Sequence, residues 1–114
     1  MHELSIAGSL FDILQNIAKE NNLKKIYKVT ILAGRMRQIV PTAMEMAFTA
    51  VTAGSLAEGA KLEIEVVPIK MRCVSCSEEF SVWHNIYICP SCESAKLELL
   101  QGDELIVKNI EGED

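Results

Sequence analysis

The sequence predicts an α+β protein: a small three-stranded sheet carries two helices, and a zinc-ribbon-like module of short β-hairpins is inserted into it. Two observations predict this fold. Apolar residues recur at helical spacing in two segments and alternate in a strand-like way in three others. After residue 70 the composition changes to cysteine, serine and turn-forming residues until about residue 95. Because a sheet with two helices would bury all the apolar faces, we expect the cysteine-rich stretch to be a separate insertion.

The first helix is predicted over residues 4–20, where apolar residues lie three and four positions apart. The pair Asn21-Asn22 is a plausible stop for it. Alternation then predicts a strand that Gly34 ends. One side of this strand is expected to face inward and comprises Tyr27, Val29, Ile31 and Ala33.

Pro41 suits the first turn of a second helix, where its missing N–H costs nothing. Gly54 is placed to cap the end of that helix. The apolar face between them comprises Met44, Ala47, Phe48 and Val51. A second strand is predicted over 62–69, and Pro68 indicates an edge or the end of pairing. Its inward side chains are expected to be Leu62, Ile64 and Val66.

A third strand is predicted over 105–110, and residues 97–100 either start this strand or form a separate arm. The acidic tail 111–114 is expected to be frayed. We therefore expect an α/β domain built from residues 1–69 and 97–114, and a module spanning 70–96. A strand reached through an inserted module could exchange between protomers, so a homodimer is an open alternative.

The net charge of −5 and the scattered basic residues count against a nucleic-acid partner, which would need a basic patch. The same features count against docking on an anionic membrane. No stretch approaches the roughly 18 continuous apolar residues of a membrane span, and the first residues do not resemble a signal peptide. The expected location is therefore the cytoplasm.

The cysteines form two knuckles, Cys73-x2-Cys76 and Cys89-x2-Cys92, separated by twelve residues. Two such turns can aim four thiolates at one tetrahedral ion, and this arrangement leaves no open position for water. The spacing therefore predicts a structural zinc site, although iron also suits four thiolates. A redox dithiol is less favoured, because it usually comes as one pair. A hairpin linking the knuckles could form from Phe80, Val82, Trp83, Tyr87 and Ile88.

The histidine content argues against an enzyme. The chain has two histidines, His2 and His84, and neither lies in a recognisable nucleophile–base pair. His84 lies between the knuckles and is interpreted as a surface residue, since four cysteines already complete the site. The exposed aromatic candidates Trp83 and Tyr87 either anchor a partner or simply pack the hairpin.

The first three residues offer a second set of metal ligands. His2 can present its imidazole, its backbone nitrogen and the Met1 amine, and the backbone nitrogen of Glu3 completes a planar set of four nitrogens. Such a set favours Ni(II) or Cu(II) over zinc. The Glu3 side chain could instead add an oxygen ligand. The alternative is that His2 is an ordinary flexible terminal residue.

Taken together, these features resemble the HypA/HybF family, nickel-delivery accessory proteins for the maturation of nickel–iron hydrogenase. The resemblance covers the whole chain. It depends on the Met1-His2-Glu3 start, the helix–strand–helix–strand order, the two cysteine knuckles and the Gly102-Asp-Glu-Leu105 entry to the last strand.

The resemblance implies a metallochaperone with Ni²⁺ at His2 and Glu3 and structural Zn²⁺ at Cys73, Cys76, Cys89 and Cys92. The α/β domain would then be nickel-binding and the module zinc-binding. Implied partners are the nickel-associated GTPase HypB and the hydrogenase large-subunit precursor, and some members also serve urease. Two arginines in segment 34–40 depart from the neutral turn expected there. The alternative function is a zinc-ribbon protein-interaction module without nickel transfer.

Overall fold

The computed structural model describes residues 2–114, apart from the side chain of His2. The chain forms two compact units. The helical unit comprises residues up to Ile31 together with Ile39–Glu65 and Ile106–Asp114, and the cysteine unit comprises Leu32–Gln38 and Val66–Leu105. No helix among the described residues is long and apolar enough to cross a bilayer.

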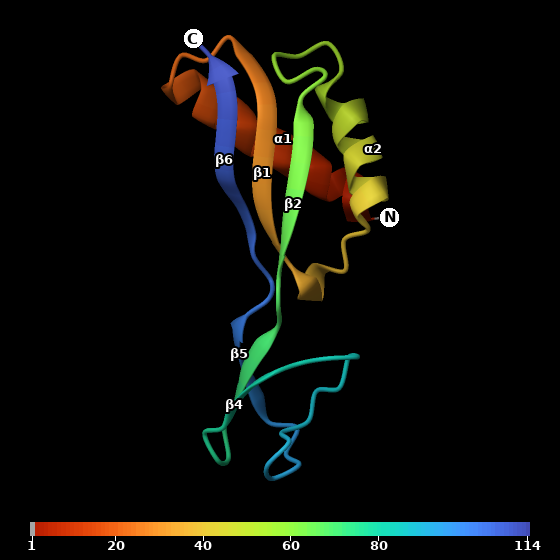
Figure 1. Ribbon diagram of the computed structural model, residues 1–114, viewed down its shortest axis with the longest axis vertical. Helices are drawn as coiled ribbons and strands as arrows, with labels where there is room; N and C mark the ends of the chain where they lie inside the picture. The colour runs from red at the N-terminus through yellow and green to blue at the C-terminus, as the bar shows by residue number, and fades with distance from the viewer. Residues whose placement is uncertain (1) are drawn as a thin grey trace. The chain divides into compact units, whose positions relative to one another are not determined.

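The helical unit is built on a three-stranded sheet with the strand order β2-β1-β6. Helix α1 crosses one face of this sheet, and α2 lies beside β2 and packs against α1 (Figure 1). The predicted three-stranded sheet with two helices is therefore confirmed. The elements are α1 (His2–Glu20), β1 (Lys25–Gly34), α2 (Pro41–Thr52), β2 (Lys61–Val67) and β6 (Leu105–Glu113).

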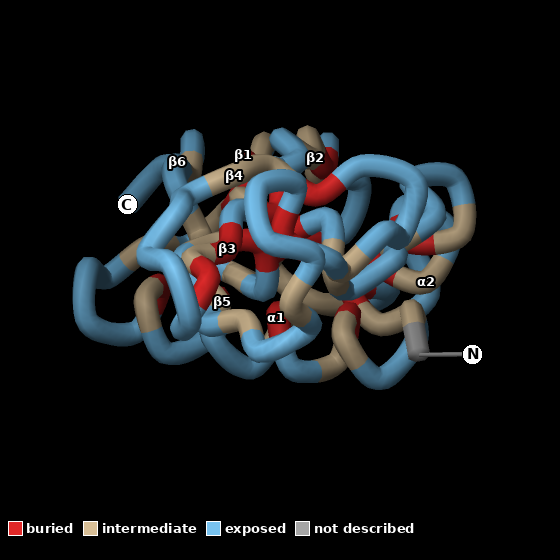
Figure 2. Tube along the Cα trace, turned by 90° about the horizontal axis from the view of Figure 1, so that it is seen from below, coloured by how far each residue is buried: buried red, intermediate tan, exposed pale blue. Residues whose placement is uncertain are grey.

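The core of this unit lies between the helices and the sheet, and its residues belong to the buried class shown in red in Figure 2. The helical periodicity correctly predicted the buried face of each helix, apart from Leu4, which has the same spacing but is 57% exposed. Pro41 occupies the start of α2, as expected. The fully buried side chains include Ala7, Leu10 and Leu14 of α1, Val29 and Ile31 of β1, and Met44 and Phe48 of α2.

Two inward-facing residues were predicted wrongly. Tyr27 is 49% exposed, whereas Ile26 beside it is fully buried. The N–H of Ile26 donates to the carbonyl of Leu56, 2.9 Å away, which places Ile26 against the turn that follows α2. The Tyr27 phenol instead bonds Glu113, and this hydrogen bond raises its pKa. Val66 is 50% exposed, although it follows the alternation of Leu62 and Ile64.

The second strand is shorter than predicted. β2 ends at Val67 and β3 begins at Lys70, so the segment around Pro68 separates two strands that belong to different sheets. Proline has no N–H to donate to a ladder, which explains the break. Ile69 is buried in the core of the cysteine unit.

The acidic tail is ordered up to Glu113, so the predicted fraying is wrong for residues 111–113. The N–H of Lys24 donates to the carbonyl of Glu113 at 2.8 Å. Gly112 lies so close to the carbonyl of Lys25 that a Cβ there would overlap it. These main-chain contacts extend β6 beyond the predicted end at residue 110.

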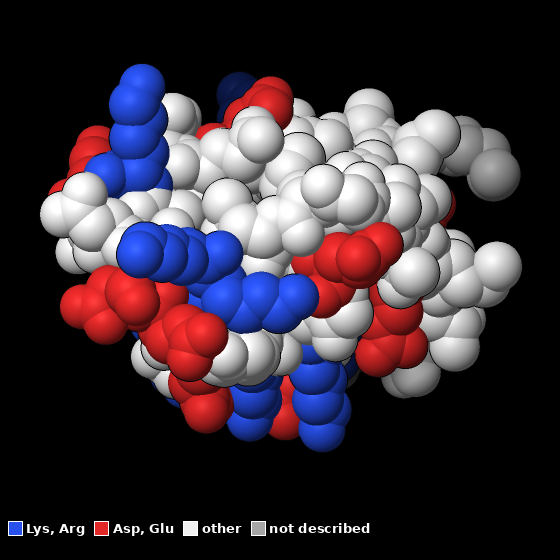
Figure 3. Space-filling view, turned by 90° about the horizontal axis from the view of Figure 1, so that it is seen from above, with Lys and Arg blue, Asp and Glu red and all other residues white. Residues whose placement is uncertain are grey.

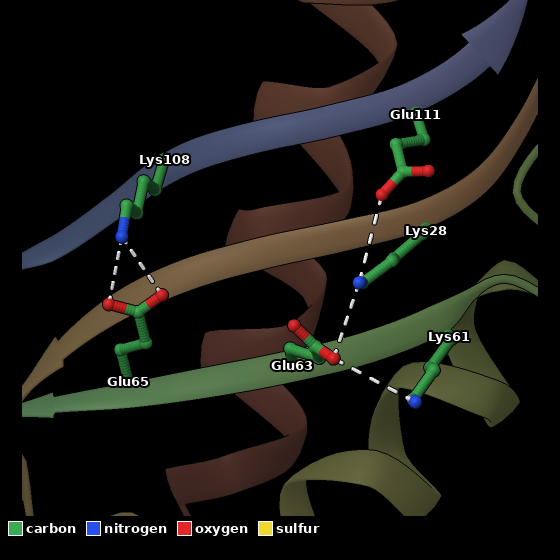
Figure 4. Close-up of polar contacts among 6 residues, drawn as sticks. All are labelled: Lys28, Lys61, Glu63, Glu65, Lys108 and Glu111. Carbon is green, nitrogen blue, oxygen red and sulfur yellow. Dashed lines mark hydrogen bonds and ion pairs between the residues drawn. The ribbon is translucent and has the colours of Figure 1, made fainter.

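Ion pairs cover part of the sheet in the helical unit (Figure 4). Lys108 of β6 reaches both carboxylate oxygens of Glu65 on β2, each at 3.0 Å. Lys28 of β1 lies 3.3 Å from Glu63 and 3.7 Å from Glu111. Basic and acidic side chains also lie next to one another in the view of Figure 3. Because exposed pairs contribute about 0–1 kcal/mol each, they mainly keep this surface polar.

The cysteine unit contains an antiparallel sheet with the order β4-β3-β5. Its strands are β3 (Lys70–Cys73), β4 (Glu79–Ser81) and β5 (Leu97–Gln101). Residues 97–101 therefore form a separate strand and do not start β6. Met71 pairs with Phe80 on one side and with Leu99 on the other. A small buried cluster of Ile69, Met71 and Val82 forms the core.

The cysteine unit includes residues 32–38 in addition to 66–105. The short helix η1 (Arg35–Arg37) follows β1. The N–H groups of Gly34 and Met36 donate to the carbonyls of Glu104 and Gly102, both at 2.8 Å. A Cβ at Gly34 would overlap the Gly102 carbonyl, so only glycine permits this approach.

Candidate metal centre

The two cysteine knuckles have the same backbone hydrogen bonds. In the first, the N–H of Ser77 donates to the carbonyl of Cys73, and the N–H of Cys73 donates to the carbonyl of Glu78, both at 2.8 Å. In the second, the N–H of Glu93 donates to the carbonyl of Cys89, and the N–H of Cys89 donates to the carbonyl of Ser94, both at 2.9 Å. The residue that follows each knuckle has a left-handed backbone, with φ of 66° at Ser77 and 62° at Glu93. The sequence repeat is thus also a structural repeat.

The four cysteine sulfurs converge on one point. All of them lie within 4.8 Å of one another, and among the side chains that the structure describes they form the group whose ligand atoms could hold a metal ion. The Cys73–Cys92 and Cys76–Cys89 sulfur pairs are 3.5 Å apart. Sulfurs at the corners of a zinc tetrahedron lie about 3.8 Å apart, given a Zn–S bond of roughly 2.3 Å. The set therefore fits a closed, structural zinc site.

The cysteines are free thiols with unequal acidity. The backbone N–H of Cys76 and the Cys92 thiol lower the pKa of Cys73 to about 6, against the opposing effect of burial. For Cys76, the N–H of Glu78 lowers the pKa, but the Cys89 thiol and burial outweigh it and raise the pKa to about 12. The negative charge of one thiolate thus disfavours ionisation of its neighbours. A divalent cation would offset this repulsion, and the thiols would lose their protons when it binds.

The predicted hairpin between the knuckles does not form. The hairpin of this unit is β3–β4, and it carries the first knuckle at its turn. The segment after β4 contains turn residues instead, with left-handed conformations at His84 and Asn85. β4 pairs with β3, and residues 82–96 contain no second strand with which a hairpin between the knuckles could form. His84 is exposed, in agreement with its interpretation as a surface residue.

The two aromatic candidates lie in different environments. Tyr87 is half-buried and packs against the cluster of Ile69, Met71 and Val82. Trp83 is 53% exposed, and the guanidinium of Arg35 lies 5.4 Å from the centre of its ring. That distance is typical of a cation–π contact.

The second predicted site is described only in part. Helix α1 begins at His2, so Glu3 lies in its first turn. The Glu3 carboxylate accepts a hydrogen bond from the N–H of Val40, with an N–Oε2 distance of 3.3 Å. The Met1 amine and the His2 imidazole, which the predicted nickel site needs, lie outside the described residues. The sequence did not reveal the Val40 contact.

Comparison with known proteins extends over nearly the whole chain. The family model described as "Hydrogenase/urease nickel incorporation, metallochaperone, hypA" matches residues 1–112. A relative named hydrogenase maturation factor HypA, from Desulfitobacterium hafniense (strain DSM 10664 / DCB-2), is 39% identical over 114 residues and covers 100% of both chains. Its namesake in Moorella thermoacetica is 38% identical and covers 99% of this chain and 100% of its own.

Solved structures have the same fold. The solution structure of the Ni metallochaperone HypA from Helicobacter pylori matches with a TM-score of 0.74 and 26% identity, covering 99% of this chain and 98% of its own. A second solution structure, of a HypA protein, matches with a TM-score of 0.71 and 27% identity, over 98% and 96% of the two chains. The agreement in sequence and in fold shows that this chain belongs to the HypA family.

Proposed function

We propose that this protein is a metallochaperone that binds Ni(II) and delivers it during the maturation of nickel–iron hydrogenase. The observation that supports this most is the match of the HypA family model to residues 1–112, which include the Met-His-Glu start. Urease is a second candidate recipient, because the family description names it as well.

In this proposal nickel binds in the helical unit, at the start of α1. His2 supplies the main ligand through its imidazole, and the backbone nitrogens of His2 and Glu3 with the Met1 amine complete the set. A site with few ligands at a chain terminus suits transfer, since a partner with better ligands can capture the ion. Binding requires that protons leave the ligands, so affinity is expected to fall as the pH drops through the histidine range near roughly 6.5.

Zinc has the structural role. Cys73, Cys76, Cys89 and Cys92 would hold it, and the convergence of their sulfurs within 4.8 Å supports this assignment. Four thiolates leave no position at which a substrate could bind, which supports a protein without catalytic activity. Nickel would then bind in the helical unit and zinc in the cysteine unit.

The proposed partners are related to hydrogenase maturation. The GTPase HypB would act with the protein in nickel handling, and the hydrogenase large-subunit precursor would receive the ion. A homodimer in which a strand is exchanged between protomers is a further proposal, and a measurement of the molecular mass in solution can test it. The cytoplasm is the proposed site of action.

The competing function is a zinc-ribbon interaction module that carries no nickel. Its strongest support is the closed geometry of the cysteine site, which requires no second metal. The two functions differ in what they expect of His2: only the metallochaperone loses a metal-binding activity when that imidazole is removed.

The test is calorimetric titration of nickel into zinc-loaded protein that begins with an untagged Met1. Wild type is compared with His2→Ala, and His84→Ala is the matched control because it removes the only other histidine. We expect about one Ni(II) per chain for wild type and for His84→Ala, and loss of binding in His2→Ala with zinc retained. Equal titration of all three proteins would instead support the interaction module.

A further inference from the structure

An exposed pair of side chains, Arg35 and Trp83, lies on the surface of the cysteine unit. Tryptophan and arginine are among the residue types that contribute most to binding energy in protein interfaces. A single exposed apolar side chain is ordinary, but Ile86 and Ile88 in the segment after Trp83 are exposed as well. The segment 83–88 therefore presents three large apolar side chains to solvent, and an arginine lies over the first of them.

The backbone that carries Arg35 is held in place on both sides. The N–H groups of Gly34 and Met36 donate to carbonyls of the loop 102–104, both at 2.8 Å. The Nε of Arg37 donates to two carbonyls of the same loop, at 2.7 and 3.1 Å. Met36 also packs against the buried cluster of this unit. The Arg35 side chain therefore extends from an ordered backbone.

The backbone at Trp83 is ordered as well. Val82 before it is buried, and the N–H of Val82 donates to the carbonyl of Ile69 at 2.9 Å. After it, the N–H of Ile86 donates to the carbonyl of Trp83 at 3.1 Å. Tyr87 then packs against the buried cluster. Because both backbones are already ordered, a ligand of the two side chains loses little affinity to the ordering of the chain.

The guanidinium of Arg35 is available to a ligand. Among the residues that the structure describes, it makes no ion pair and donates no hydrogen bond. Arg72 of the same unit differs, since it lies 3.2 Å from the Glu98 carboxylate. The Glu104 carboxylate, in the loop next to Arg35, accepts the N–H of Gly102 at 2.9 Å. The N–H donors of Arg35 thus remain for a ligand, and their planar arrangement suits bidentate binding of a carboxylate.

We propose that Arg35 and Trp83 form a docking site for a segment of a partner protein that carries an aspartate or glutamate next to an apolar side chain. The carboxylate binds the Arg35 guanidinium, and the apolar side chain packs on the Trp83 ring. Binding pairs a charge that has no ion-pair partner in the described chain, and it removes apolar surface from water. This inference goes beyond the proposed nickel function and does not depend on it, because both residues belong to the cysteine unit.

The charge of the cysteine unit favours a protein partner over nucleic acid or an anionic membrane. Nucleic acid and anionic lipid surfaces are bound through several cations at once. Residues 32–38 and 66–105 carry six acidic and five basic residues, within a chain of net charge −5. One arginine without an ion pair suits one carboxylate, whereas the acidic residues of the same unit would repel an extended polyanion.

The test uses the zinc-loaded 114-residue chain and an immobilised library of capped random hexapeptides. Selected peptides are resynthesised and titrated in solution, where emission of Trp83, the only tryptophan, reports binding at this site. Arg35→Gln is compared with Lys96→Gln, which removes another exposed cation of the unit. Trp83→Ala is compared with Val74→Ala, which shortens another exposed apolar side chain, and anisotropy of a labelled peptide follows binding in this pair.

We expect the selected peptides to carry an aspartate or glutamate next to a leucine, an isoleucine or an aromatic residue. Arg35→Gln and Trp83→Ala should each weaken their binding about 3- to 30-fold, as expected for loss of a charge-assisted or central interface contact. Lys96→Gln and Val74→Ala should bind like wild type. Replacing the acidic residue of the peptide by its amide should weaken binding to wild type by a similar factor, with no further loss in Arg35→Gln.

Several results would overturn the inference. Selection of no peptide, or of peptides without an acidic residue, would show that Arg35 does not recognise a carboxylate. Equal losses in the site variants and in their controls would indicate a general effect of charge or surface. Tighter binding of a single-stranded oligonucleotide or of phosphatidylglycerol vesicles, with a shift of Trp83 emission, would assign the site to another class of partner. Zinc content and thermal unfolding check that each variant is folded, and the acid and amide peptides decide with wild type alone if a variant is not.

Discussion

Loss of zinc is expected to unfold the cysteine unit and to leave the helical unit folded. The main buried cluster of the cysteine unit comprises Ile69, Met71 and Val82. At about 1.5–3 kcal/mol for each buried side chain, this cluster contributes roughly 5–9 kcal/mol. Fixing the backbone of the eight knuckle residues, 73–76 and 89–92, costs about 8–16 kcal/mol at roughly 1–2 kcal/mol each.

This cluster therefore offsets the ordering of the knuckles only at the lower end of that cost. Structural zinc binds peptides of this kind with an apparent free energy of about 10–16 kcal/mol, which is sufficient. The helical unit has a separate core, with Leu10, Leu14, Ile31 and Phe48 among its fully buried residues. It should remain folded when the metal is removed.

Two optical signals distinguish the units. Trp83 is the only tryptophan and lies in the cysteine unit, whereas both α-helices lie in the helical unit. Removal of zinc by a strong chelator should change Trp83 emission while the helical circular dichroism is retained. The variant Cys76→Ser should reproduce this behaviour, and Ser75→Ala in the same knuckle is its control. The reasoning is refuted if metal analysis shows that zinc has gone and both signals persist, or if the helices melt together with the knuckles.

Three further predictions follow from contacts in the two units. Gly34→Ala should lower the thermal stability by about 1–3 kcal/mol, because its Cβ would overlap the Gly102 carbonyl; a wild-type melting temperature would contradict this. Gly8→Ala should raise stability by about 0.5–1 kcal/mol in the same assay, since a Cβ there meets nothing within 4 Å and alanine favours the helix. The hydrogen bond to Glu113 raises the pKa of Tyr27, so its contribution to stability is present below the ordinary value of about 10 and is lost as the pH rises through the raised value. Tyr27→Phe should remove this loss of stability at high pH, which denaturation midpoints at about pH 8 and pH 11 can measure. An unchanged pH dependence of stability in the variant would argue against the hydrogen bond.

Local patterns predicted most of the fold. The helical spacing around Leu10 and Leu14 and around Met44 and Phe48 correctly indicated which side of each helix is buried. This works because both the period of a helix and the burial of its apolar face act over a few neighbouring residues. The two cysteine knuckles were predictable for the same reason, since two residues between ligands already determine a tight turn.

Errors arose where distant segments meet. Tyr27 follows the alternation of its strand, yet it faces solvent and bonds Glu113, while the turn near Leu56 covers Ile26. Residues 97–101 have strand character, but the chain sequence did not decide between β6 and a separate strand beside β3. The acidic tail carries no apolar pattern, and main-chain bonds to residues near Lys24 keep it extended.

The sequence by itself predicted two sets of metal-ligand residues, because ligand chemistry depends on side-chain type and close spacing. His2 with Glu3 stays a prediction, whereas the sulfurs of the four cysteines come together in the structure. Only the tertiary structure decided how those residues are held. The bond between Glu3 and Val40 spans 37 residues, and the convergence of two knuckles requires β3, β4 and β5 to pair. Such contacts depend on which surfaces pack together, and a local pattern does not record that information.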